Sequence, residues 1–171
     1  MLSLATWTLA SVLTAGHGAA PAAADAVLDG PTRHVRTTDR AMRKLLGNGY
    51  THSPTFAALV AYLERSDLYV YIEEVPRLPG ALEGRLLVLQ PAHGFRYVRI
   101  QIARRGGPND SIAVLAHELR HAIEVADDPS VINAQTLIAL YRRIGIDHGN
   151  NEYDTIAAQE TGRRVLKELV A

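Results

Sequence analysis

The chain has 171 residues, 18 basic against 18 acidic side chains, 47% apolar residues and no cysteine. This length is typical of one compact domain, and a net charge of zero with both signs scattered along the chain argues against a nucleic-acid partner. The absence of cysteine excludes disulfides, thiolate zinc sites and a cysteine nucleophile, so any bound metal must have histidine and carboxylate ligands.

The N-terminal segment resembles a secretory signal peptide. Residues 1–24 contain no Asp, Glu, Lys or Arg, their apolar core is too short to span a membrane, and three alanines precede Asp25 as at a signal-peptidase site. We therefore expect residues 25–171 to form a single domain that is secreted or periplasmic and has no stable membrane span. An uncleaved anchor or a misassigned start codon are the alternatives, because a signal normally opens with Lys or Arg.

Two helices are predicted next. The first covers residues 37–46 and ends at the Gly-Asn-Gly of residues 47–49, which favour the left-handed conformation of a helix end. The second opens at Ser53, an N-cap residue followed by proline at the first helical position, and continues to Leu63.

Three short runs rich in β-branched and aromatic residues follow the helices. They are LYVYIEEV from Leu68, RLLVLQ from Arg85 and FRYVRIQIA from Phe95. In the last run, bulky apolar residues alternate with polar or aromatic ones, which indicates a strand with one buried face. Turn residues separate the runs, so we expect a three-stranded antiparallel sheet.

The rest of the chain has helical periodicity. Helices are predicted over residues 111–126, 129–144 and about 152–170, with Asp128 capping the second and Gly145 ending it. Two helices, a three-stranded sheet and three further helices make an α+β domain.

The segment His117-Glu118-Leu119-Arg120-His121, in the first of these three helices, matches H-E-x-x-H. Residues four apart lie one turn apart on the same helix face, so both imidazoles can reach one metal ion with Glu118 beside it. The helix is apolar over more than half of its circumference, and buried unpaired charge is costly, so a bound dication would stabilise it. The alternative is an ordinary polar layer in which both histidines pair with Glu124 and backbone groups.

HELRH, preceded by SIAVLA and by a strand such as FRYVRIQIA, resembles the active-site helix of zincin metallopeptidases over roughly a fifth of the chain. The resemblance implies that His117 and His121 bind zinc and that Glu118 is the general base that activates the metal-bound water. It also implies a peptide or protein substrate that lies extended along a sheet edge. The residue types agree, because neutral imidazoles suit zinc, and three protein ligands plus water make an open catalytic site.

The third ligand is ambiguous in the sequence. The metzincin pattern needs Gly and His where this chain has Glu124 and Asp127, and that reading fails. The resemblance is closer to gluzincins, which take a carboxylate from a later helix, and we expect Asp154 on the first turn of the last helix. Glu124 is the main alternative, although it suits a hydrogen bond to a histidine ring better. The remaining candidates are Glu152, Glu160, Asp127 and His148.

The function predicted from the sequence is that of a small secreted zinc-dependent hydrolase, most directly a metallopeptidase, with Glu118 as its base. Tyr153 and His148 are weaker candidates for stabilising an oxyanion in the transition state. Two alternatives stay open. One is a catalytically inactive zincin-like domain that only holds metal, and the other is a metal-free structural protein with a coincidental motif.

Overall fold

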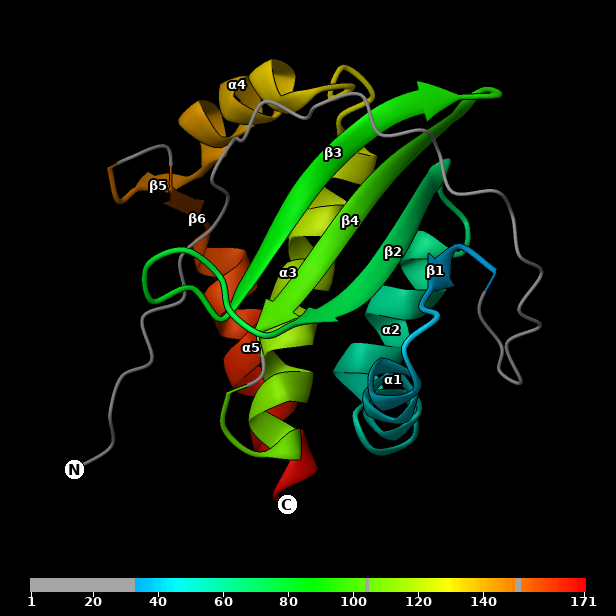
Figure 1. The fold of residues 1–171 in the computed structure, drawn as a ribbon, viewed down its shortest axis with the longest axis vertical. Helices are drawn as coiled ribbons and strands as arrows, with labels where there is room; N and C mark the ends of the chain where they lie inside the picture. The colour runs from blue at the N-terminus through cyan, green and yellow to red at the C-terminus, as the bar shows by residue number, and fades with distance from the viewer. Residues whose placement is uncertain (1–32, 104, 150–151) are drawn as a thin grey trace.

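The computed structural model describes residues 33–103, 105–149 and 152–171 (Figure 1). The predicted signal peptide lies outside these residues and stays a prediction. Within the described part, the chain forms five helices, one four-stranded sheet and one two-stranded sheet, which confirms the α+β class. No helix among the described residues is long and apolar enough to cross a membrane.

The three predicted strands and five predicted helices are all present, together with three short strands that the sequence did not indicate. The elements in chain order are β1 (Val35–Arg36), α1 (Arg40–His52), α2 (Pro54–Leu63), β2 (Leu68–Val75), β3 (Gly84–Ala92), β4 (Phe95–Ala103), α3 (Pro108–Asp127), α4 (Ala134–Ile144), β5 (Ile146–Asp147), β6 (Tyr153–Asp154) and α5 (Ile156–Leu169).

The expectation of a three-stranded antiparallel sheet is wrong. The main sheet has the order β1-β2-β4-β3, in which β2 is parallel to both β1 and β4, and only β3 and β4 are antiparallel. The reason is that β3 and β4 form a hairpin whose second strand returns between β3 and β2. Residues 76–83 carry the chain past the place that β4 then occupies (Figure 1).

Both boundaries of the first helix differ from the prediction. Helix α1 begins at Arg40 and not at residue 37, and it does not end at residues 47–49 but continues to His52. Gly49 serves close packing instead, because a Cβ there would lie 2.9 Å from the Phe56 ring. Ser53 caps α2 as predicted, and its hydroxyl accepts a hydrogen bond from the Phe56 amide at 3.0 Å.

The last two helices begin later than predicted, whereas α3 begins earlier, at Pro108. Asn133, not Asp128, caps α4, and its side chain accepts a hydrogen bond from the Thr136 amide. Helix α5 begins at Ile156 after its cap Thr155, so Asp154 lies on β6 and not in the first turn of the helix.

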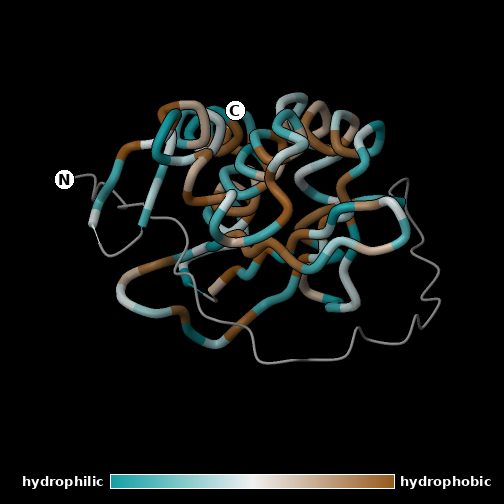
Figure 2. Tube along the Cα trace, turned by 90° about the horizontal axis from the view of Figure 1, so that it is seen from above, coloured by the Kyte–Doolittle hydropathy of each residue, from teal (hydrophilic) through white to brown (hydrophobic). Residues whose placement is uncertain are grey.

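The helices pack on one face of the main sheet, and hydrophobic segments concentrate where the two layers meet (Figure 2). Val70, Val98 and Ile100 point from the strands into this core and are fully buried. Helix α3 lies at its centre, since it contacts β2, β3 and β4 as well as α1, α2 and α5. The H-E-x-x-H motif is therefore on the most enclosed helix of the fold.

Candidate metal centre

Helix α3 begins at Pro108, and the Asp110 carboxylate accepts a hydrogen bond from the Gly107 amide at 2.9 Å, which stabilises the first turn. From Ile112 to Val125 all but one residue of the helix is buried, the exception being the partly exposed Arg120. The polar side chains of the motif therefore face other protein elements and not solvent.

His117, His121 and Asp154 form a compact group of possible metal ligands. The two Nε2 atoms of His117 and His121 are 3.1 Å apart. Asp154 Oδ1 lies 3.2 Å from His117 Nε2 and 3.5 Å from His121 Nε2. Zinc bonds of about 2.0–2.1 Å in a tetrahedral site give ligand–ligand edges of about 3.3–3.4 Å. The three measured edges match one face of such a tetrahedron, and no fourth His, Asp or Glu of the described residues joins the group.

Asp154 reaches the histidines from a different part of the chain. Pairing of β6 with β5 and the start of α5 hold the residue in place. The Thr155 amide donates to Asp154 Oδ1 at 2.6 Å, and Gln159 Nε2 donates to Oδ2 at 2.9 Å. Asp154 is fully buried. The structure therefore brings together the three residues that the sequence favoured as ligands.

Glu124 lies on the other side of the His121 ring. Its Oε2 accepts a hydrogen bond from His121 Nδ1 at 2.8 Å, and its Oε1 accepts one from the Thr155 hydroxyl at 2.7 Å. A proton on Nδ1 leaves Nε2 of His121 as the lone-pair donor toward the centre. Glu124 thus orients the His121 ring and is not itself in the group.

The remaining candidates for the third ligand are not part of this group. In the described residues, the group consists of His117, His121 and Asp154 only. Asp127 instead accepts a hydrogen bond from the hydroxyl of Tyr62. His148 is exposed.

Glu118 lies beside the group and is 2% exposed. Its Oε2 is buried and has no hydrogen-bond partner among the described residues. The first residue of β3 covers the carboxylate, since a Cβ on Gly84 would lie 2.6 Å from Glu118 Oε1. Burial, reinforced by the charges of Asp154 and Glu124 and opposed by His121, raises the pKa of Glu118 to about 8.

The centre has more acidic groups than basic ones. Burial lowers the pKa of His117, whereas hydrogen bonds to Asp154 and Glu124 outweigh burial and raise the pKa of His121 to about 9. For Asp154, burial is outweighed by hydrogen bonds from both histidines, which hold its pKa well below the usual value. Three buried carboxylates around two imidazoles favour a bound cation, and the donor set suits a divalent ion.

Tyr141 is a residue of the centre that the sequence did not indicate. It is 1% exposed, and its ring meets the His121 ring edge to face with centroids 5.3 Å apart. Its position in α4 beside the buried Leu137 and Leu140 gives it the pattern of an ordinary core residue. Its contact with His121 becomes visible only in the three-dimensional structure.

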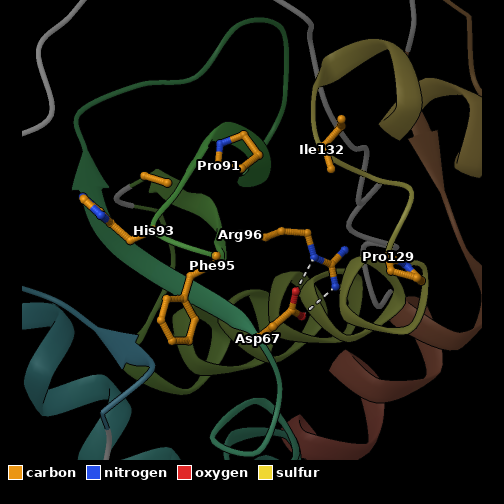
Figure 3. A pocket seen from close by; sticks show the side chains of 9 residues that line it. Asp67, Pro91, His93, Phe95, Arg96, Pro129 and Ile132 are labelled. Carbon is orange, nitrogen blue, oxygen red and sulfur yellow. Dashed lines mark hydrogen bonds and ion pairs between the residues drawn. The ribbon is translucent and has the colours of Figure 1, made fainter.

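The centre is closed in this conformation. Each of the three possible ligands and Glu118 is at most 2% exposed. A cavity of about 420 Å³ lies beside the β3–β4 hairpin, next to the Asp67–Arg96 ion pair (Figure 3). Another, of about 210 Å³, lies between α2, α3 and α5. Neither cavity is lined by any of these four residues, so a substrate reaches them only if a covering segment moves.

No protein-family model matches the chain, and neither the curated proteins nor the solved structures gave a match. Function is therefore inferred from the geometry of the centre.

Proposed function

We propose that the protein is a zinc-dependent hydrolase, and specifically a peptidase, in which His117, His121 and Asp154 hold the ion and Glu118 is the general base. The observation that carries the proposal is the set of three donor atoms with mutual distances of 3.1, 3.2 and 3.5 Å. The resemblance of HELRH to the zincin active-site helix supports the same assignment.

A zinc ion held by these donors would polarise a carbonyl oxygen and lower the pKa of coordinated water toward about 7. Glu118 supplies the proton transfers that amide hydrolysis needs. Its free Oε2 accepts a proton from the attacking water, and the same oxygen then gives the proton to the leaving amine.

A second candidate is a closed structural metal site, and the complete burial of the centre favours it. Two observations favour the hydrolase over it. A closed site is completed by a fourth protein ligand, and here three donors form the group. A structural site also has no use for a buried carboxylate oxygen without a partner, which costs about 1–3 kcal/mol or more if it is left unsatisfied.

Replacement of Glu118 by Gln tests the proposed function. We expect Glu118→Gln to retain one zinc per chain and its unfolding temperature, and to lose about 10²–10⁴-fold in the rate of cleavage of a peptide library. The matched control is Glu160→Gln, which removes an exposed carboxylate from α5 and should leave both quantities unchanged. Equal turnover by Glu118→Gln would rule out this mechanism. Stoichiometric zinc without any cleavage by the wild type would support the structural site instead.

A further inference from the structure

Thr155 forms hydrogen bonds to both carboxylates that lie beside the two histidines. Its backbone amide donates to Asp154 Oδ1 at 2.6 Å, and its hydroxyl donates to Glu124 Oε1 at 2.7 Å. The residue is buried, so water does not weaken either bond. The same hydroxyl accepts a hydrogen bond from the Ala158 amide at 3.1 Å, which caps α5. One residue is therefore bonded to α3, to β6 and to the start of α5.

The hydroxyl bond extends to a histidine of the group through Glu124. A hydroxyl has one proton to donate, and in Thr155 that proton goes to Glu124 Oε1 while the oxygen accepts from the Ala158 amide. The other carboxylate oxygen, Oε2, lies 2.8 Å from His121 Nδ1. The chain of contacts from Thr155 through Glu124 thus fixes the orientation of the His121 ring.

The three possible ligands come from two segments, α3 and β6, so the shape of the group depends on how these segments are placed. Asp154 Oδ1 lies 3.2 Å from His117 Nε2 and 3.5 Å from His121 Nε2. A site that binds metal tightly holds its ligands to within about 0.5 Å of the required geometry. Thr155 acts on both segments at once, because its amide holds the Asp154 oxygen and its hydroxyl holds the Glu124 carboxylate.

Ser53 shows that capping a helix does not by itself require such a position. Its hydroxyl also accepts from a helix amide and donates to a carboxylate, that of Glu168, and it too is buried. Glu168 bonds Thr55 as well, and it is not a member of the metal-ligand group. Ser53 and Thr155 therefore have the same local hydrogen bonds and differ in what their carboxylate partner holds.

We propose that Thr155 is a positioning residue of the metal centre, and that its hydroxyl holds Glu124, and through it His121, in the orientation that binds the ion. This inference rests on the metal site of the proposed function and does not depend on turnover. Thr155 contacts neither the ion nor a substrate, so its effect reaches the group only through Glu124 and Asp154. The hydroxyl should therefore matter for metal affinity as well as for stability.

The test is Thr155→Val, which removes the hydroxyl and keeps the shape of the side chain and the amide. We expect its zinc affinity, measured against a competing chelator, to fall about 10–100-fold. The visible spectrum of bound Co²⁺ should also change, because it depends on the geometry around the metal. Thr155→Ser keeps the hydroxyl and should restore both. Thr155→Gly serves if the valine variant does not fold, since glycine is about as good an N-cap as threonine.

Ser53→Ala is the matched control, because it removes the same pair of hydrogen bonds at another helix. It should lower the unfolding temperature of the metal-free protein, as Thr155→Val does, and leave zinc affinity and the cobalt spectrum unchanged. The variant that combines Thr155→Val with Glu124→Gln should bind zinc about as weakly as Glu124→Gln alone, because the two side chains act in series.

These readouts separate the two proposals. A wild type that binds no zinc would overturn the proposed function and this inference with it. A wild type that binds zinc, beside a Thr155→Val variant with the same affinity and the same cobalt spectrum, would overturn the positioning role alone. Equal losses of zinc affinity in Thr155→Val and Ser53→Ala would also overturn it, because they would show a general effect of lower stability.

Discussion

Glu124 decides which ring nitrogen of His121 faces the centre, because its carboxylate is 2.8 Å from Nδ1. Glu124→Gln weakens this contact and lets the ring turn or change tautomer. We expect zinc affinity to fall about 10–100-fold, the usual effect of losing a group that orients a metal ligand. Titration against a competing chelator measures the change, with Glu160→Gln as the control. Unchanged affinity would show that Glu124 does not orient the ligand.

Asp154 should be more sensitive than Glu124, because it supplies a donor atom. We expect Asp154→Ala to lose stoichiometric zinc at concentrations that saturate the wild type, and to lose activity in parallel. Zinc content after dialysis measures this directly. If Asp154→Ala kept its zinc while Glu124→Gln lost it, the third ligand would be on α3 and the assignment of Asp154 would be wrong.

At the scale of single residues, spacing along one helix was enough to predict that His117 and His121 share a face. Asp154 lies beside both histidines, as its predicted role as a ligand requires, but on β6 and not on the last helix, since it precedes the Thr155 cap. Tyr141 and Gly84 could not be predicted. Their roles depend on α4 and β3 crossing α3, and no local pattern in the sequence encodes such contacts.

Helices α3 and α5 pack closely because α5 has glycine at the contact. A Cβ at Gly162 would lie 3.1 Å from the Ala113 carbonyl oxygen and 3.5 Å from His117 Cβ. We expect Gly162→Val to push α5 outward, to lower the free energy of unfolding by about 1–3 kcal/mol and to weaken zinc binding. Urea unfolding of the metal-free protein and a zinc titration measure the two effects.

Gly47→Ala is the matched control for Gly162→Val. Gly47 lies within α1, and a Cβ there meets nothing within 4 Å. Alanine should therefore raise the free energy of unfolding by about 0.5–1 kcal/mol and leave zinc binding unchanged. A Gly162→Val variant as stable as the wild type would contradict the close packing of the two helices.

At the scale of elements, periodicity located all five helices of the described residues, and β-branched runs located the three long strands. The order of the strands was not predictable, because insertion of β4 between β2 and β3 depends on long-range pairing. The predicted helix boundaries were wrong where one residue carries the sequence signal of a helix start but lies at the end of another helix. Asp128 resembles an N-cap, but its backbone amide bonds the Val125 carbonyl at the end of α3, and its side chain accepts from Ser130.

For the whole molecule, Arg96 ties the sheet to the end of α3. Its guanidinium donates to the carbonyl oxygens of Val125 and Ala126 at 2.8 and 3.0 Å, and both Asp67 oxygens accept from it at 2.8 Å (Figure 3). The hydrogen bonds from Arg96 are the main reason that the pKa of Asp67 is lowered. This ion pair makes stability depend on pH.

Because the folded pKa of Asp67 lies below its unfolded value of about 3.9, the pair contributes fully above about pH 4. Its contribution is lost as the pH falls through the folded pKa. The Asp67 side chain is 47% exposed, so we expect the effect to be at most about 1 kcal/mol. Urea unfolding of the wild type and Asp67→Asn should differ at pH 6 and converge toward pH 2. A difference that is constant with pH would contradict this role.

The closure of the centre also concerns the whole molecule, because α3, β3, α4 and β6 enclose it together. A zinc ion bound there stabilises the folded state by mass action, whether or not the protein catalyses a reaction. Identification of the ion and its ligands therefore precedes every question about substrate.

The most direct test is a crystal structure of the protein grown with zinc, with an anomalous difference map collected at the zinc edge. We predict a single strong peak among the described residues, about 2.0–2.2 Å from His117 Nε2, His121 Nε2 and an Asp154 oxygen, with Glu124 and Glu118 outside bonding distance. No peak at this position, with the three side chains hydrogen-bonded to one another, would contradict the account.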